Sequence, residues 1–397
     1  MSDFNDVQST IFQFLPSKTK TKVITSSKNF PDINLLTDIP DFDNNELCDA
    51  FTEDNFKTLI KNTNLDRQKL FKCVVERGLI KYVKILLKKT DQRYGIKNVN
   101  PEDMDNAAII GASYNGHFGV VKLLLQDSRV NPADRNNFSI SIASKKGHTG
   151  VVKLLLSDPR VNPADRDNIA IRLSSQNGHI GVVKLLLSDP RVDPTVLYNY
   201  AIRWASQNGH VEVVKLLLLD TRVNPADRDN DAIRLASKNG HIEVLKLLLS
   251  DPRVNPASWD NNAIRLASEN GQFEVVKLLL SDPRVNPAYR DNIAIIGASE
   301  NGHFEVIKLL LKDPRVNPAG GNNLAIFWAS QNGHIEVVKL LLSDPRVNLA
   351  DRDNGAIRVA SQNGHIEIVK ELSKHTIIKT PKKPDIKILK LIVSSLK

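Results

Sequence analysis

Residues 229–259 read DNDAIRLASKNGHIEVLKLLLSDPRVNPASW, and this stretch decides the architecture of the chain. Nine copies of it follow one another without insertion or deletion. Glycine recurs every 31 residues from position 116 to 364, lysine from 122 to 370, and valine from 99 to 347. A strict period of this length is typical of a solenoid, whose units bury their apolar faces only against neighbouring units. The repeat therefore predicts one linear stack rather than several independent globular domains.

Each copy predicts a pair of helices. Asn168 can N-cap a short first helix, which ends at Gly178 because glycine adopts the left-handed conformation without a Cβ penalty. A second helix follows, with Ile180 and Val183 on its predicted buried face, and Pro190 stops it because proline cannot donate the next backbone hydrogen bond. The expected fold class is all-α: a solenoid of helix-turn-helix units joined by short, hairpin-like fingers.

This unit resembles the ankyrin repeat. The residues that carry the resemblance are Ala205-Ser206, Asn208-Gly209-His210 and the segment EVVKLLL at 212–218. The sequence IAIR at 169–172 stands where the family has Thr-Pro-Leu-His, and Asp-Pro-Arg replaces the family's Gly-Ala-Asp after the second helix. The resemblance implies a protein-binding module that contacts its partners through the fingers and a concave groove.

The limits of the repeat divide the chain into four segments. They are a non-repeat N-terminal segment at 1–64, a degenerate ankyrin-like copy at 65–98, nine tandem repeats at 99–371, and a basic C-terminal cap at 372–397. The last repeat carries Glu371 and Ser373 at leucine slots, as expected for a terminal unit with no neighbour beyond it.

Charge is concentrated in the flanks of the array. The chain has a net charge of +9, but residues 99–371 are neutral, while 65–98 carry +7 and 372–397 carry +6. A nucleic-acid-binding protein is expected to carry its basic stripe along the binding surface, so this distribution argues against nucleic acid as the partner. Binding of nucleic acid by the lysine-rich flanks alone stays an alternative, and it predicts that the binding affinity falls steeply with salt concentration.

Several other classes are excluded by composition. Cys48 and Cys73 alone cannot staple a chain of 397 residues, so a disulfide-built secreted protein is excluded and a reducing compartment is expected. No apolar run approaches the roughly 18–20 residues that span a bilayer, and the N-terminus shows no secretory signal. We expect a cytoplasmic protein without membrane contact. A nuclear location stays open, as does the host cytoplasm if the protein is viral.

Two recurring residue types could carry chemistry. A histidine column could hold metals or act in acid–base catalysis, and an arginine column could bind phosphate. Zn–N bonds of about 2.0–2.1 Å cannot join rings in stacked repeats about 8–10 Å apart, so we expect the histidines to make structural hydrogen bonds. We expect the arginines to lie beyond helix C-termini, neutralised by neighbouring aspartates. The columns comprise histidine at 117, 148, 179, 210, 241, 303, 334 and 365, and arginine at 129, 160, 191, 222, 253, 284, 315 and 346.

No nucleophile elbow, phosphate loop, HExxH or CxxC motif occurs in the sequence. The carboxylates lie at repeat positions, where they more often cap helices or pair with cations. We therefore expect no catalytic residue, no metal and no cofactor, and the chain is interpreted as a non-enzyme.

Differences between copies mark the expected binding surface. Position by position, the finger slots mostly carry Ala-Asp-Arg-Asp-Asn, but a few fingers carry large apolar or aromatic residues. Exposed aromatic residues are enriched at protein–protein hot spots, although these rings could instead pack between adjacent fingers or lie half-buried on the first helix. The candidate partner-binding residues are Val196, Leu197, Tyr198, Tyr200, Trp204, Trp259, Tyr289 and Trp328.

The N-terminal segment offers a second function. Residues 11–18 (IFQFLPSK) followed by 23–30 (VITSSKNF) resemble part of an F-box, although the family's opening Leu-Pro-x-Glu is absent. The resemblance implies a substrate receptor that docks on an adaptor of a cullin-type ubiquitin ligase. The alternative interpretation is an amphipathic capping segment. The adaptor-docking residues would be Ile11, Phe12, Phe14, Leu15, Pro16, Val23, Ile24 and Phe30.

Overall fold

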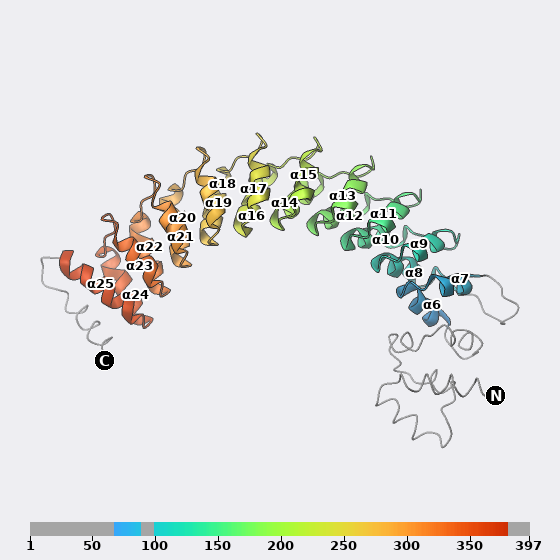
Figure 1. The fold of residues 1–397 in the computed structure, drawn as a ribbon, viewed down its shortest axis with the longest axis horizontal. Coiled ribbons are helices and arrows are strands. Elements are labelled where there is room, and N and C mark those ends of the chain that lie inside the picture. The colour runs from blue at the N-terminus through green and yellow to red at the C-terminus, as the bar shows by residue number, and fades with distance from the viewer. Residues whose placement is uncertain (1–66, 89–98, 380–397) are drawn as a thin grey trace, which may run out of the picture. The chain divides into compact units, whose positions relative to one another are not determined.

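The computed structural model describes residues 67–88 and 99–379, and every regular element in these ranges is a helix (Figure 1). The predicted all-α solenoid of helix pairs is confirmed. The chain forms two compact units. Among the described residues, unit 1 comprises those up to Ser174 together with Gly181–Asp193, and unit 2 comprises Ser175–Ile180 together with those from Pro194 onward.

Unit 1 is built from helix pairs in which first helices pack on first helices (α6, α8, α10) and second helices on second helices (α7, α9, α11). Figure 1 shows these pairs following one another in chain order. The helices are α6 Arg67–Glu76, α7 Ile80–Leu87, α8 Asp103–Tyr114, α9 Phe118–Leu125, α10 Asp134–Lys146, α11 Thr149–Leu156, α12 Asp165–Gln176 and α13 Ile180–Leu187. The last residues of α12 and the first residue of α13 fall within Ser175–Ile180, which is assigned to unit 2.

Unit 2 repeats the same packing over six pairs, with α14 to α24 as successive first helices and α15 to α25 as successive second helices. The helices are α14 Val196–Gln207, α15 Val211–Leu218, α16 Asp227–Asn239, α17 Ile242–Leu249, α18 Ser258–Glu269, α19 Phe273–Leu280, α20 Tyr289–Glu300, α21 Phe304–Leu310, α22 Gly320–Gln331, α23 Ile335–Leu342, α24 Asp351–Gln362 and α25 Ile366–Lys379.

The core runs through each unit as one layer of repeated apolar side chains. In the α16–α17 pair, whose helices are in contact, Ile233 and Ala236 of the first helix and Val244 and Leu248 of the second are all at most 1% exposed. Fully burying a side chain of this size contributes about 1.5–3 kcal/mol, so the repetition of the slot stabilises the stack. One prediction was wrong: Ile180 is 44% exposed at the start of its helix.

The link between repeats is a short left-handed turn. In seven repeats the first three residues after the helix start have positive φ, for example Arg228 (+50°), Asp229 (+55°) and Asn230 (+60°). Each residue in this conformation costs about 1–2 kcal/mol, and Asn and Asp tolerate it best. The connections are thus turns, and no described residue lies in a strand.

The asparagine at the end of this turn does not cap its helix, contrary to prediction. Asn168 Oδ1 accepts from the backbone N–H of Asp193, 25 residues ahead in the next finger, at 2.9 Å. The same bond recurs from Asn106 to Asn323, and the side chains are 4–7% exposed. This asparagine therefore ties each repeat to the following one.

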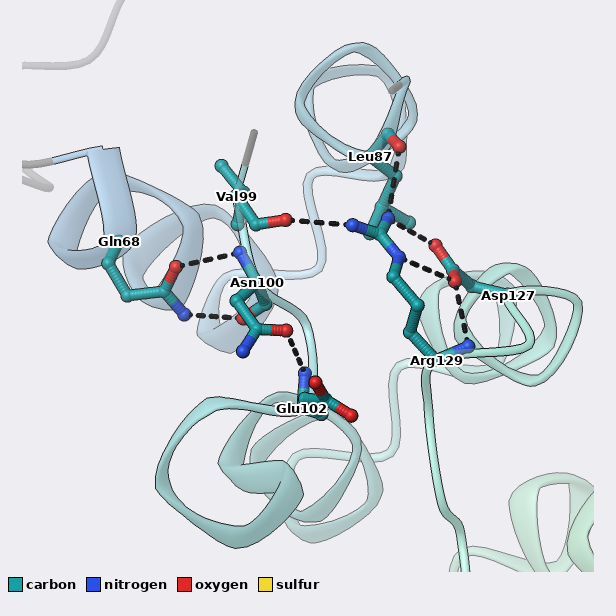
Figure 2. A network of polar contacts seen from close by, with 7 residues as sticks. All are labelled: Gln68, Leu87, Val99, Asn100, Glu102, Asp127 and Arg129. Carbon is teal, nitrogen blue, oxygen red and sulfur yellow. Dashed lines mark hydrogen bonds and ion pairs between the residues drawn. The ribbon is translucent and has the colours of Figure 1, made fainter. Parts of the chain in front are cut away.

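Figure 2 shows how the first helix pair joins the regular array in unit 1. The Gln68 amide on α6 donates to the Asn100 carbonyl at 2.7 Å and accepts from the Asn100 N–H at 3.2 Å. Arg129 donates to the carbonyls of Val99 (3.1 Å) and Leu87 (3.3 Å). Side-chain hydrogen bonds to the backbone thus join the first helix pair to the array.

A column of buried serines runs along the first helices, and most of their hydroxyls have no hydrogen-bond partner among the described residues. Ser237 is such a case, whereas Ser299 donates to the Ile295 carbonyl at 2.7 Å. Because an unpaired buried hydroxyl costs about 1–3 kcal/mol, we expect Ser237→Ala to leave the unfolding free energy unchanged or raise it. Urea unfolding of Ser237→Ala beside Ser299→Ala checks this; a larger loss in Ser237→Ala would contradict it.

Candidate functional site

The histidine column is structural, as predicted. His241 Nε2–H donates to the Gln207 carbonyl in the preceding repeat at 2.9 Å, and its ring covers Gly209. Gln272 occupies the same slot and donates its amide to the Lys238 carbonyl at 3.2 Å, so the slot requires a donor and not an imidazole. The same bond is made by His117, His148, His210, His303, His334 and His365.

The arginine column is also structural. Arg284 donates to both Asp282 oxygens, at 2.9 and 2.7 Å, and through Nη1 to the Val254 carbonyl of the previous repeat at 3.0 Å. The predicted aspartate neighbours are thus its ion-pair partners. The same bonds are made by Arg129, Arg160, Arg191, Arg253, Arg315 and Arg346.

These pairs predict acid sensitivity. Hydrogen bonds from Arg284 hold the pKa of Asp282 below its usual value, as the equivalent arginine does for Asp251 and Asp313. A carboxyl whose pKa is lowered by folding stabilises fully above its unfolded pKa and loses this stabilisation as the pH falls through the folded pKa. We therefore expect the urea concentration at the unfolding midpoint to decrease once the pH is lowered below about 4. The midpoint of the Asp282→Asn variant should decrease less steeply with falling pH than that of the native chain, and an equal slope would contradict the assignment.

The variable fingers of unit 2 expose large side chains. Tyr198 is 64% exposed, Trp259 60%, Leu197 44% and Tyr289 38%. We call these four residues the variable finger surface. They lie at the starts of α14, α18 and α20. These three helices belong to one row of first helices, in which α14 packs on α16, α16 on α18 and α18 on α20.

The backbone under three of these side chains disfavours them. Leu197, Tyr198 and Trp259 have φ of +52°, +57° and +49°, in the left-handed region that bulky residues avoid. The other fingers place Met, Arg or Gly at the first of these slots and Asp or Asn at the second. Neither burial nor local conformation accounts for the large residues, and strained residues of this kind cluster at functional sites.

Arginines from α16 lie against the exposed rings. The Arg228 guanidinium lies 5.4 Å from the Tyr198 ring centroid, and that of Arg234 lies 4.3 Å from Trp259. Stacking of this kind contributes about 0.5–1 kcal/mol at exposed sites. The arginines therefore fix the rings while leaving them largely exposed.

A buried ionic network supports this surface from below. Arg203, 7% exposed, donates to Asp231 at 2.6 Å and to the carbonyls of Leu197 and Tyr198. Asp231 also accepts from Arg234 at 2.9 Å, and burial lowers the pKa of Arg234. This network was not predicted, although its signal was present: position 231 carries aspartate where the other repeats carry Ala, Phe, Ile, Tyr, Asn, Leu or Gly.

The remaining partner-binding candidates lie deeper. Trp204 and Trp328 are half-buried on their first helices, one of the placements left open by the sequence. Trp204 stacks on Tyr200 with centroids 5.3 Å apart, and the Tyr200 hydroxyl donates to Gln176 at 3.1 Å. Val196 is also partly buried, so each of these side chains offers only part of its surface to a partner.

The candidate adaptor-docking residues of the N-terminal segment lie outside the described residues. Within the described ranges, no group of three or more His, Cys, Asp or Glu side chains could hold a metal ion. All helices in those ranges are too short or too polar to cross a membrane.

Comparison with known proteins bears on the repeat region. Residues 202–291 and 295–383 match the family model described as "Ankyrin repeats (3 copies)". A crystal structure of the human ASB11 ankyrin repeat domain is similar at 18% identity over 48% of this chain and 90% of that chain, with a TM-score of 0.42, a likeness too low to carry an argument. Comparison with curated proteins gives no match. The two matched segments contain ankyrin repeats, and the 31-residue period to which they belong runs unbroken back to residue 99.

Proposed function

We propose that the chain is a non-catalytic scaffold that binds a partner protein through the variable finger surface. Ankyrin repeats are generally interaction modules. The single observation that carries the proposal is the placement of Tyr198 and Trp259, which are more than half exposed and have left-handed backbone conformations. A partner that covers these rings supplies the burial that the free chain does not.

The physical chemistry of the surface suits such a partner. Aromatic side chains bury about 150–250 Å² each and dominate interface energetics. The rings are held by Arg228 and Arg234, so less side-chain entropy is lost when they bind.

Reversion to the common finger tests the proposal. The variant carries Leu197→Arg, Tyr198→Asp, Trp259→Arg and Tyr289→Asp, which are the residues of the Asp-Arg-Asp finger at 227–229. The fold is retained because other repeats carry these residues. The matched control is Leu219→Ser, which replaces a 75% exposed leucine at the end of α15 by the serine of neighbouring repeats.

The measurement is affinity capture from a eukaryotic lysate, with bound proteins identified by mass spectrometry. We expect the native chain and Leu219→Ser to retain the same partners and the reverted variant to lose them. Unaltered capture by the reverted variant would place the site elsewhere.

The second proposal is a substrate receptor of a cullin-type ubiquitin ligase that docks through residues 7–31. It rests on the sequence IFQFLPSK at 11–18. Capture by the full chain beside a form lacking residues 1–64 separates the two. A ligase adaptor bound only by the full chain would support the receptor; identical partners without a ligase component would leave the plain scaffold.

The proposed location is the cytoplasm, with the nucleus or a host cytoplasm as alternatives. One observation argues against a reducing compartment: Cys73 in α6 is buried and disulfide-bonded. Alkylation of thiols in the protein isolated from its own cells and then unfolded in urea tests the location, because unfolding removes the protection that burial gives Cys73. Quantitative labelling is expected for the cytoplasm, and protection would contradict it.

A further inference from the structure

The second helices of unit 1 carry lysines whose charge is not balanced on the same helix. These four helices, α7, α9, α11 and α13, contain no Asp or Glu. In unit 2, helices α15, α17, α19, α21 and α23 each have a glutamate three residues before the lysine, as in the Lys246–Glu243 pair at 2.7 Å. The lysines of unit 1 occupy the same exposed slot and are Lys84, Lys122, Lys153 and Lys184.

The aspartates that follow these helices are already engaged. Asp127, Asp158 and Asp189 come after α9, α11 and α13, and each pairs with the arginine two residues further on, at 2.6 to 2.7 Å. They therefore supply little charge for the lysines, and the row of second helices in unit 1 presents a net positive surface.

Exposed apolar side chains lie beside the lysines. Glycine replaces the glutamate of unit 2 in α9, α11 and α13, and a Cβ at Gly119 would lie 2.8 Å from Ile80 Cδ1. Ile80 is 47% and Phe118 49% exposed, whereas Phe273 in the equivalent slot is partly buried, with Glu305 in the next second helix. Stacking therefore does not require the glycines. We call the following residues the lysine surface: Ile80, Lys84, Phe118, Lys122, Lys153 and Lys184.

A cavity of about 390 Å³ lies between the C-terminal ends of α7 and α9, next to this surface. Its walls include Lys84, Lys88 and Leu123. It has room for one large side chain, and its lining combines positive charge with aliphatic surface. An occupant of the whole surface must therefore supply both carboxylates and apolar side chains.

The same chain contains a segment of that composition. Residues 29–56 have eight Asp or Glu and no Lys or Arg, interleaved with apolar residues such as Leu36 and Phe42. Residues 57–66 connect this acidic segment to α6, and a short tether gives an effective concentration in the millimolar range. Cys73 in α6 is disulfide-bonded, and the only other cysteine of the sequence, Cys48, belongs to the acidic segment.

We propose that the acidic segment, residues 29–56, docks on the lysine surface of the same chain. Its carboxylates pair with the lysines, and its apolar side chains cover Ile80 and Phe118 and enter the cavity. Nucleic acid would pair with the lysines but leave these two apolar residues exposed, so the observations favour the segment. The lysine surface belongs to unit 1, and its assignment does not depend on the variable finger surface.

Carbodiimide coupling tests the contact, because it joins a carboxylate to an amine only where the two groups meet. The full chain is coupled after reduction with dithiothreitol, as an equal mixture of ¹⁴N and ¹⁵N chains, and the links are identified by mass spectrometry. We expect links within one chain from residues 32–54 to Lys122 and Lys153. No such link, an equal yield at Lys246 or Lys339, links only between two chains, or loss of the links on reduction would overturn the proposal.

Neutralising part of the acidic segment tests the role of charge. The acetylation rates of Lys122 and Lys153 are measured by mass spectrometry in the full chain. We expect both to rise about fivefold in the variant, because the tethered segment no longer covers these amines. Unchanged rates, or protection that appears only when a DNA duplex is added, would overturn the proposal. The substitutions are Asp32→Asn, Asp38→Asn, Asp41→Asn and Asp43→Asn.

The matched control makes the same change of charge on exposed glutamates of unit 2. It should leave the acetylation of Lys122 and Lys153 unchanged, and circular dichroism checks that both variants keep the helical fold. A rise as large as that in the first variant would show a general effect of net charge and would overturn the proposal. The control substitutions are Glu212→Gln, Glu243→Gln, Glu274→Gln and Glu305→Gln.

Discussion

Replacing Gly209 with valine is expected to reduce the unfolding free energy of the α14–α17 region by about 3 kcal/mol. Gly209 has a φ of +75°, and a Cβ there would lie 2.6 Å from His241 Nδ1. The backbone conformation costs a β-branched residue about 1–2 kcal/mol or more, and displacing the His241 ring adds an overpacking cost of about 1–3 kcal/mol. Amide hydrogen exchange of α14–α17 measures the effect, because repeat arrays open locally.

Two controls separate these costs. Gly364 has a φ of +76° with no atom within 4 Å of its Cβ position, so Gly364→Val carries the backbone cost alone. His241→Ala in the Gly209→Val background removes the collision, and the double variant should show a favourable coupling. Equal losses at Gly209 and Gly364 would contradict the collision, and no loss at either would contradict the left-handed helix end.

Asn199→Ala is expected to cost about 3 kcal/mol. Asn199 is 5% exposed, accepts from the Asn224 N–H at 2.9 Å, and donates to Asp227 at 2.8 Å. A hydrogen bond to a charged group contributes about 1.5–3 kcal/mol and a neutral one about 1 kcal/mol, and alanine also tolerates the φ of +53° poorly. Hydrogen exchange of α14 and α16 again measures the loss.

Asn199→Gly and Asn208→Ala are the matched controls. Glycine keeps the left-handed conformation and loses only the side-chain bonds, so it should be less damaging than alanine. Asn208 is exposed and donates to the Gln176 carbonyl at 2.8 Å, so Asn208→Ala should cost under about 1 kcal/mol. If Asn208→Ala costs as much as Asn199→Ala, the asparagine column does not join the repeats as described.

The helix pairs could be predicted from the sequence because their signals are local. Gly178 ends a helix, and Val182, Val183 and Leu186 lie on one buried face at helical spacing. The left-handed turn could not be predicted, since it places arginine, leucine or tryptophan where local preference alone would not. The role of Asn168 could not be predicted either, because its hydrogen-bond partner lies 25 residues ahead, whereas an N-cap bonds only within the first turn of its own helix.

The candidate site was predicted only in part. Comparing copies within the chain selected Tyr198 and Trp259, because an aromatic ring stands out among Arg and Asp residues. The same comparison overlooked Asp231, since one more carboxylate resembles those around it in the sequence. Its role depends on Arg203 and Arg234 from two helices, which spacing does not reveal.

Photo-crosslinking tests most directly whether the variable finger surface binds a protein. A photoreactive phenylalanine is placed at Tyr198, Trp259 or Leu219 of the full chain, and the chain is irradiated in a eukaryotic lysate. We predict that one partner protein becomes covalently attached at Tyr198 and Trp259 and not at Leu219. Attachment of the same partner at Leu219 with equal yield, or at none of the three, would contradict the account.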